Sequence, residues 1–201
     1  MEFREILLIF NCFALASILY KELNENYKDN IEIQKSSVGI LSIALTQYFI
    51  SAWLSINKNE KQMAEDIRYA DWLFTTPLLL YTYYKLAENN GYVSNFKPLF
   101  VSVVAMIVLG YISEKSNNSV QWYVVSMIPY LYILYEITNI QKHFDQKQMK
   151  SHKDLGNFFI YGWAVYPLGF FLNSEYKYII YNIGDFINKG VYSLELYKLL
   201  K

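Results

Sequence analysis

Residues 68–82 read RYADWLFTTPLLLYT, and Asp185 and Lys189 stand four residues apart in a second apolar stretch near the end of the chain. Both stretches carry ionisable side chains, Arg68 and Asp71 in the first and the Asp–Lys pair in the second. Such groups are costly in hydrocarbon, and by default they mark a functional site. The pattern therefore predicts membrane-spanning helices that carry a buried, charged site.

The composition fits a single apolar, aromatic-rich domain spanning residues 1–201. Hydrophobic residues make up 54% of the chain and aromatic residues 18%, and the tyrosines among them suit membrane interfaces. The formal net charge is zero, which argues against nucleic-acid binding as the main role. Cys12 is the single cysteine and forms no intramolecular disulfide. No signal-peptide cleavage site follows the first apolar run, so we expect this run to be a membrane span.

Long apolar runs separated by short polar connections recur along the whole sequence. Seven such runs lie at residues 5–20, 36–56, 69–86, 98–113, 119–140, 157–173 and 177–199. A soluble helical protein of this size has no need of so many nearly uncharged helices. The sequence therefore predicts an all-α, multi-pass integral membrane protein, a bundle of seven transmembrane helices in a lipid bilayer.

The distribution of basic residues indicates how this bundle is oriented. If the N-terminus lies outside, the inner connections and tail hold eleven Lys and Arg residues, Lys28 among them. The outer side then holds six, counting Arg68 at the outer end of the third run. Because inner loops of membrane proteins are enriched in Lys and Arg, we expect the N-terminus outside and the C-terminus inside.

The charged residues fall on two helix faces. Arg68 and Asp71 are three residues apart and Asp71 and Thr75 are four apart, so all three lie near one face of the third run. Asp185 and Lys189 share a face of the seventh run for the same reason. Two carboxylates and two cations that face one another are nearly neutral overall, the condition under which buried charges are tolerated. One interpretation is a structural ion-pair network between two helices.

The other interpretation is chemical and depends on Lys189. A lysine amine in an apolar helix readily forms a Schiff base with a carbonyl compound. The protonated imine then needs a counter-ion, which Asp71 and Asp185 can supply. With a conjugated aldehyde as the partner, light-driven isomerisation would move the imine proton relative to Asp71.

The run Arg68–Asp71–Thr75–Pro77, together with Asp185–Lys189, resembles helices C and G of the microbial (type 1) rhodopsins. The resemblance covers most of helices C, F and G and is weaker in helices B, D and E. It implies that Lys189 binds retinal covalently as a Schiff base. It also implies these roles: Asp71 as proton acceptor and counter-ion, Asp185 as second counter-ion, Arg68 as a gate toward the outer side, Thr75 as hydrogen-bond partner of the acceptor, and Tyr48 and Tyr166 as partners of Asp185.

The same resemblance implies a retinal pocket with flat, apolar walls. Residues 162–170 read GWAVYPLGF and are similar to a tryptophan–tyrosine–proline run in helix F of the family. Any one of these aromatic residues alone is more often plain core. The expected wall residues are Trp72, Thr76, Met106, Gly110, Trp122, Tyr123, Ser126, Trp163, Tyr166, Pro167 and Phe170. Pro77 and Pro167 are expected to bend their helices around the chromophore.

Three departures from the family pattern bear on function. Thr82 stands where proton pumps of this family usually carry a carboxylic acid that donates a proton. Phe170 replaces a tryptophan, and no clear glutamate pair for proton release follows helix F. Without the usual donor, we expect the imine to recover its proton slowly from the inner solvent, through Glu195 or Glu136.

The leading function is a light-driven outward proton pump, since the acceptor residues are present. The alternative is a light-gated cation channel lined by polar residues of the first, second and seventh runs: Asn11, Ser17, Ser37, Ser42, Gln47 and Asn182. These residues can equally form ordinary interhelical hydrogen bonds. A sensory photoreceptor and a seven-helix receptor or transporter without retinal remain as further alternatives. We expect no enzymatic activity, and we expect a homo-oligomer that moves protons or small cations. The Lys-, Asn-, Ile- and Tyr-rich composition also resembles rhodopsins of large viruses.

Overall fold

The computed structural model describes residues 3–25, 30–58 and 60–201, without the side chains of residues 58, 61 and 62. Lys28, counted above on the inner side, lies outside the described residues, as do the side chains of Lys58 and Lys61 on the outer side. The expected orientation across the bilayer therefore stays a prediction.

The described residues form seven consecutive helical segments, which confirms the fold expected from the apolar runs. Four of them are α1 (Phe3–Leu23), α3 (Lys61–Asn89), α4 (Phe96–Lys115) and α5 (Ser119–Gln146). The second is α2 (Ile31–Trp53), extended by the π-helical turn η1 (Leu54–Lys58). The sixth consists of α6 (Lys150–Leu155), the π-helical turn η2 (Phe158–Gly162) and α7 (Val165–Gly169). The seventh consists of α8 (Ser174–Asp185), the π-helical turn η3 (Phe186–Val191) and α9 (Tyr192–Leu200).

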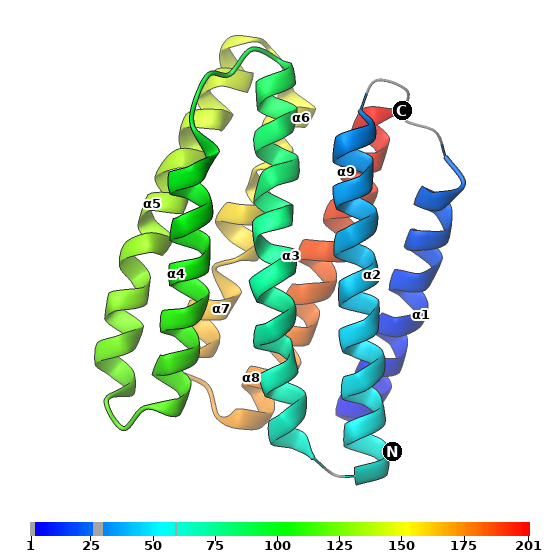
Figure 1. Ribbon diagram of the computed structural model, residues 1–201, viewed down its shortest axis with the longest axis vertical. Coiled ribbons are helices and arrows are strands. Elements are labelled where there is room, and N and C mark those ends of the chain that lie inside the picture. Colours follow the sequence, from blue (N-terminus) through cyan, green and yellow to red (C-terminus); the bar gives the residue numbers. More distant parts are fainter. Residues whose placement is uncertain (1–2, 26–29, 59) are drawn as a thin grey trace.

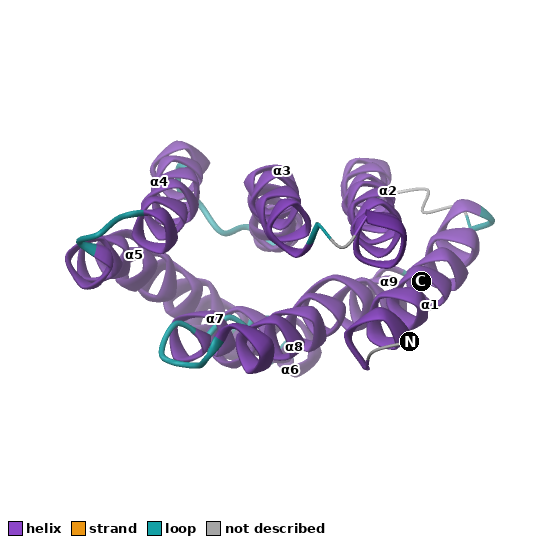
Figure 2. Ribbon diagram, turned by 90° about the horizontal axis from the view of Figure 1, so that it is seen from below, coloured by secondary structure: helices purple, strands orange, loops and turns teal. Residues whose placement is uncertain are grey.

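The segments stand side by side in two layers. Seen along the bundle, α2, α3 and α4 form one row, and α1, the α8–α9 segment, the α6–α7 segment and α5 form a curved row opposite (Figure 2). The two chain termini lie at opposite ends of the bundle (Figure 1). We call these the N-terminal end and the C-terminal end. α3 and the α8–α9 segment therefore face each other across the middle of the molecule.

The local sequence explains where several helices begin and how two of them are interrupted. The Asn95 side chain accepts a hydrogen bond from the Lys97 backbone N–H at 3.0 Å, and this caps α4. Asn173 caps α8 in the same way, at 3.1 Å from the backbone N–H of Tyr176. α3 continues through Pro77, whereas the segment that contains Pro167 is broken into short pieces. The π-helical turn η3 carries Lys189, and such turns are frequent at functional sites.

Two clusters of buried apolar side chains hold the layers together. The larger one joins α2, α3, α4, α5, the sixth segment and α9 and includes Tyr83, Ile137 and Phe159. The smaller one joins α1, α2 and α8 and includes Leu15 and Leu41. The α8–α9 segment contributes to both clusters, so the residues it carries are fixed relative to both halves of the bundle.

The outer surface is rich in apolar side chains. Large hydrophobic residues such as Phe13, Leu131 and Phe171 are 60–73% exposed. Among the described residues, three helices are long and apolar enough to cross a membrane by length and composition: Phe3–Leu23, Ile31–Asn57 and Phe96–Lys115. α3 carries Arg68 and Asp71 within its length, which lowers its mean hydropathy.

The contact between α7 and α8 generates a first prediction. A Cβ atom added at Gly169 would clash with Cε1 of Tyr181. The Tyr181 ring has little room to move, because its centroid lies 5.6 Å from that of Trp72 and 5.5 Å from that of Tyr166. We expect Gly169→Ala to lower the free energy of unfolding by about 1–3 kcal/mol, the usual range for overpacking.

Gly39→Ala is the matched control, because the nearest atom to its added Cβ would be Leu78 Cδ1 at an ordinary 3.8 Å. Alanine is also the better helix former, so this variant should be at least as stable as the native protein. Thermal unfolding in detergent micelles measures both variants. Equal midpoints for the two variants would contradict the close α7–α8 contact.

Candidate functional site

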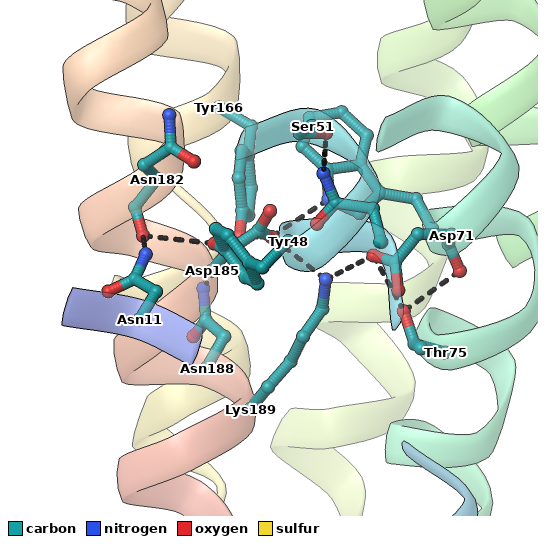
Figure 3. Close-up of polar contacts among 12 residues, drawn as sticks. Asn11, Tyr48, Ser51, Asp71, Thr75, Tyr166, Asn182, Asp185, Asn188 and Lys189 are labelled. Carbon is teal, nitrogen blue, oxygen red and sulfur yellow. Dashed lines mark hydrogen bonds and ion pairs between the residues drawn. The ribbon is translucent and has the colours of Figure 1, made fainter. Parts of the chain in front are cut away.

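A buried lysine stands between two buried carboxylates at the centre of the bundle (Figure 3). The Lys189 amine contacts Oδ2 of Asp71 on α3 and lies 3.3 Å from Oδ1 of Asp185 at the end of α8. All three side chains are at most 2% exposed. Removing charges from water is costly, and here their mutual attraction offsets part of that cost. The structure thus brings together the charged residues of the third and seventh runs.

Asp185 is held by two aromatic donors from neighbouring segments. Trp72 Nε1 donates to Asp185 Oδ1 at 2.8 Å, and the Tyr166 hydroxyl donates to the same oxygen at 2.9 Å. The second contact is the one expected for Tyr166. The first adds a role for Trp72, which the sequence analysis placed only in the pocket wall. Because both donors belong to rigid rings, Asp185 has little freedom to turn.

Asp71 has a different environment. Thr75 Oγ1 lies 3.0 Å from the Asp71 carbonyl oxygen and 3.4 Å from Asp71 Oδ2. The other carboxylate oxygen, Oδ1, is buried without a hydrogen-bond partner among the described residues. Asp185 likewise keeps one oxygen, Oδ2, without a partner among the described residues, so the two carboxylates differ in the donors that hold their other oxygen.

Arg68 is the second buried cation, and it lies one turn of α3 nearer the N-terminal end. It is 3% exposed, and its guanidinium carbon lies 4.4 Å from the ring centroid of Tyr178 and 5.7 Å from that of Tyr181. Cations are attracted to aromatic ring faces at such distances. The charged centre thus contains two cations, Arg68 and Lys189, and two carboxylates, Asp71 and Asp185. This is the composition expected from the spacing of these residues along their helices.

The contact expected between Tyr48 and Asp185 differs in the structure. The Tyr48 hydroxyl donates to the backbone oxygen of Asn182 at 3.3 Å, one turn before Asp185 on α8 (Figure 3). Asn11 Nδ2 donates to the same oxygen at 3.3 Å. Tyr48 thus fixes the backbone that leads to Asp185. The spacing of residues along each helix could not distinguish these two partners.

An elongated cavity leads away from Lys189 between the two layers. It holds about 830 Å³ of empty space, counting the open solvent at its mouth. Every pocket residue of the sequence analysis except Trp122 lines it: Trp72, Thr76, Met106, Gly110, Tyr123, Ser126, Trp163, Tyr166, Pro167 and Phe170. The ring of Phe170 stacks on that of Tyr123 at 4.3 Å.

Trp122 does not belong to the cavity wall. Its side chain is 37% exposed and is absent from the lining, although its neighbour Tyr123 is part of it. Adjacent residues of a helix point about 100° apart, so Trp122 and Tyr123 cannot both face the cavity fully. The prediction for Trp122 was wrong for this reason.

Several lining residues were missed by the sequence analysis. They are Tyr69, Leu79, Ile107, Ser113, Glu114, Met127, Tyr130, Tyr181 and Asn188. Helical spacing carried a signal for some of them, since Tyr69 precedes Trp72 by three residues and Tyr130 follows Ser126 by four. Asn188 carried none, because it reaches across to the Tyr166 hydroxyl at 3.2 Å and the Gly162 carbonyl at 3.1 Å.

The residues considered for proton return lie apart from the charged centre. Thr82 is fully buried, and its hydroxyl shares a 2.7 Å hydrogen bond with the Tyr192 hydroxyl. Glu195 forms a 2.6 Å ion pair with Lys198, and its side chain is 42% exposed. Glu136 is half-buried on α5, which lies at the edge of the bundle (Figure 2).

Comparison with known proteins agrees with this geometry. The sequence family described as bacteriorhodopsin-like protein matches residues 4–201. The green-light absorbing proteorhodopsin of Gamma-proteobacterium EBAC31A08 is 29% identical over 152 residues, 66% of this chain and 59% of that protein. Archaerhodopsin-2 of Halobacterium sp. (strain aus-2) is 29% identical over 169 residues, 77% of this chain and 61% of that protein. The chain thus spans about three fifths of the length of these relatives.

Solved structures share the fold. The blue light-absorbing proteorhodopsin from Med12 superposes with a TM-score of 0.77 at 24% identity, covering 98% of this chain and 96% of that one. Exiguobacterium sibiricum rhodopsin superposes with a TM-score of 0.81 at 24% identity, covering 98% and 95%. Together with the family match and the apolar helices, these likenesses identify an integral, multi-pass membrane protein.

The three-way contact of Lys189 generates a stability prediction. Lys189→Met removes the cation that two buried carboxylates share, and leaving buried charges unpaired costs about 3–5 kcal/mol. We expect a corresponding fall in thermal stability of the protein in detergent without added retinal. Adding Asp71→Asn to Lys189→Met removes one unpaired carboxylate and should recover part of the loss. A double variant less stable than Lys189→Met would contradict this account.

Proposed function

The chain belongs to the bacteriorhodopsin-like family, and from this premise we propose that it binds retinal on Lys189 and works as a light-driven outward proton pump. The observation that carries the proposal is the contact of a buried lysine amine with two buried carboxylates beside a cavity lined by aromatic residues. Asp71 is the proposed proton acceptor and Asp185 the second counter-ion. We propose ion transport and no enzymatic turnover.

The residues of the cavity fit a long, flat, apolar chromophore. Trp72, Trp163 and the stacked rings of Tyr123 and Phe170 supply its aromatic walls. At Gly110 an added Cβ would meet no atom within 4 Å, so the wall is open there. When bound, retinal would supply a protonated Schiff base at the Lys189 nitrogen that light-driven isomerisation reorients.

The residues around Lys189 can hold and receive a proton. Asp71 lies against the Lys189 nitrogen, so it is placed to accept a proton from that atom. Asp185 accepts hydrogen bonds from Trp72 and Tyr166, whereas the Asp71 carboxylate has only the Thr75 hydroxyl besides Lys189. This difference in donors favours Asp71 as the acceptor. Arg68 lies on the N-terminal side of Asp71. With the N-terminus outside, this order along α3 favours outward release.

The cation-channel alternative requires a continuous polar path beside α1 and α2. Asn11 and Asn182 meet at one level along the bundle, and Ser37 contacts Glu22 at another level. On α1 and α2 the two polar levels are separated by buried apolar side chains that pack in one cluster: Leu15, Ile18, Leu41 and Ala44. Ser17, expected in the channel lining, is exposed on the outer surface and bonds its own helix. The packing therefore favours a pump over a channel.

The site also fits a sensory photoreceptor, because that function uses the same chromophore. Net proton movement distinguishes the two, since a sensor has no need to transport. The expected homo-oligomer and the likeness to viral rhodopsins stay predictions.

Pigment formation tests the chromophore assignment. Native protein mixed with all-trans-retinal should develop a visible absorption band, and Lys189→Ala should not, because an imine needs an amine. Lys198→Ala is the matched control on the same segment, since the Lys198 side chain is 63% exposed and its amine pairs with Glu195. A visible band that persists in Lys189→Ala would refute the assignment.

Neutralising the proposed acceptor tests its role as counter-ion. Asp71→Asn removes a negative charge beside the Lys189 nitrogen, so the pigment band should shift and light-driven proton release should be lost. Acidification of the native pigment should produce a similar colour change as Asp71 takes up a proton. An unchanged band in Asp71→Asn would transfer the role to Asp185.

Electrical recording separates pump, channel and sensor. In cells that express the protein, a pump gives an outward light-induced current at all voltages near rest. A channel gives a current that reverses sign with voltage, and a sensor gives none. A reversing current would overturn the proposed function.

A further inference from the structure

We propose that Glu22 is a proton reservoir that returns a proton to the Lys189 nitrogen through the hydroxyls of Ser37 and Ser193. The proposal rests on the proposed function and assigns the donor that Thr82 cannot be. Among the described residues, the carboxyl groups of Glu22, Asp71 and Asp185 are the buried ones. The two aspartates belong to the site described above, and Glu22 lies apart from it, at the C-terminal end of α1.

Glu22 is held in a small polar cluster where α1, α2 and α9 meet. Ser37 Oγ lies 2.9 Å from Glu22 Oε1 and 3.2 Å from Ser193 Oγ. Glu22 is only 2% exposed, and the second oxygen of its carboxyl group, Oε2, has no hydrogen-bond partner among the described residues. A buried carboxyl group without a cation is most stable in its protonated form. Glu22 therefore suits the storage of a proton.

Most charged groups near Glu22 are bound to other partners, and Lys35, two residues before Ser37 on α2, is exposed. Glu22 forms no salt bridge within the described residues. The Lys21 amine lies 4.5 Å from the Tyr197 ring centroid, and Glu25 accepts hydrogen bonds from Tyr197 and Lys201. Lys85 forms ion pairs with Glu32 and Glu88, and Lys198 forms one with Glu195. Gln34, the remaining polar neighbour on α2, donates to the backbone oxygens of Glu22 and Glu25.

The two serines connect Glu22 to the reacting lysine. Ser193 follows Lys189 by four residues, so their backbones lie about one helical turn, or about 6 Å, apart along the segment. The Lys189 side chain extends the other way, and its amine lies 3.3 Å from Asp185 Oδ1. Ser193 and Lys189 are both at most 1% exposed. A hydroxyl has one proton and two lone pairs, so a chain of hydroxyls can point its hydrogen bonds in either direction. Ser37 and Ser193 can therefore pass a proton toward Lys189 and then reset.

The proton moves from Glu22 to the Lys189 nitrogen in successive hydrogen-bond exchanges. The O–H bond of the Glu22 carboxyl breaks as Ser37 accepts its proton, and Ser37 gives its own proton to Ser193. Ser193 gives its proton to the first of a chain of water molecules that would span the remaining distance of more than one helical turn. The last of these waters donates a proton to the unprotonated Lys189 nitrogen. Glu22 is left as a carboxylate. It then takes up a proton from the aqueous phase at the C-terminal end of the bundle, because it stands only three residues before Glu25, the last described residue of the first connection.

The corresponding position on α3 offers hydroxyl groups but no carboxylic acid that could donate a proton. Thr82 bonds the Tyr192 hydroxyl at 2.7 Å and the Leu79 carbonyl at 2.7 Å. Neither side chain is an acid that gives up a proton near neutral pH. Glu195, the nearest acid in sequence after Lys189, is exposed and paired with Lys198. The buried acid on the first segment is thus better placed than either.

The first test needs no retinal. Infrared difference spectra of the unloaded protein during a pH titration should show the C=O band of a protonated carboxylic acid at neutral pH. This band should vanish in Glu22→Gln and remain in Glu88→Gln, an acid at the same end whose side chain is 45% exposed. A native protein without the band, or a band that survives in Glu22→Gln, would overturn the reservoir.

The second test uses flash photolysis of the retinal-loaded protein between pH 5 and 9. Recovery of the dark absorbance should be nearly independent of pH in the native protein while Glu22 is protonated, and it should slow at the higher pH values at which Glu22 has lost its proton. In Glu22→Gln it should slow by about tenfold or more near neutral pH and by about a further tenfold for each pH unit above it, as solvent protons become the source. Ser37→Ala should keep the infrared band but slow recovery, because it breaks the path and leaves the acid in place.

The controls separate the two levels of the proposal. Glu22→Asp keeps an acid and should keep the band and part of the rate, which excludes misfolding as the cause of slow recovery. Equal recovery in the native protein and Glu22→Gln, or slowing by Glu195→Gln in its place, would overturn the proposal. Failure of the native chain to form a pigment would refute the proposed function, whereas the infrared band would still report on Glu22.

Discussion

The contact of Lys189 with Asp71 and Asp185 is the constraint on which the rest of the structure depends. Three charges stripped of water are tolerated in this interior only where each is placed against its partners. The contact ties α3 to the seventh segment. The donors that hold Asp185 come from α3 and α7. The arrangement of the central helices is therefore coupled to the position of one amine, and a shift of any of them would leave a charge unpaired.

The rigidity of this centre contrasts with the breaks in the helices that carry it. The rings of Trp72, Tyr166 and Tyr181 contact one another at centroid distances of 4.9–5.6 Å and leave the carboxylates little freedom. The sixth and seventh segments, however, contain π-helical turns beside the cavity. Such turns interrupt the regular hydrogen-bond ladder of an α-helix and are frequent at functional sites. The site thus combines tightly held counter-ions with interrupted helices.

The fold was predictable because it depends on long-range composition. Seven apolar runs specify seven helices whatever their detailed packing, and the described helices follow them closely. The charged centre was predictable for a similar reason, since i,i+3 and i,i+4 spacing places residues on one helix face. Contacts that cross between helices carry no such signal. Trp72 reaching Asp185, Tyr48 reaching the Asn182 backbone and Asn188 reaching Tyr166 depend on how the faces are rotated.

The burial of Glu22 is another feature that the sequence alone did not predict. In the sequence it stands between Lys21 and a polar loop, and it reads as one more surface charge of the first connection. Burial of its side chain follows only from the way α2 and α9 close over the end of α1.

The charges of the site also affect how the chain can enter a bilayer. α1, α2 and α4 are apolar enough to be stable in lipid as single helices, whereas α3 brings Arg68 and Asp71 into hydrocarbon. In a lone helix, opposite charges can pair only along that helix, Arg68 with Asp71 and Asp185 with Lys189, and these ions remain costly in hydrocarbon. The contact of Lys189 with Asp71 becomes available only when the two segments meet. Assembly of this protein in the membrane therefore couples its third and last helices, and the third helix gains this partner only after the seventh segment has been synthesised.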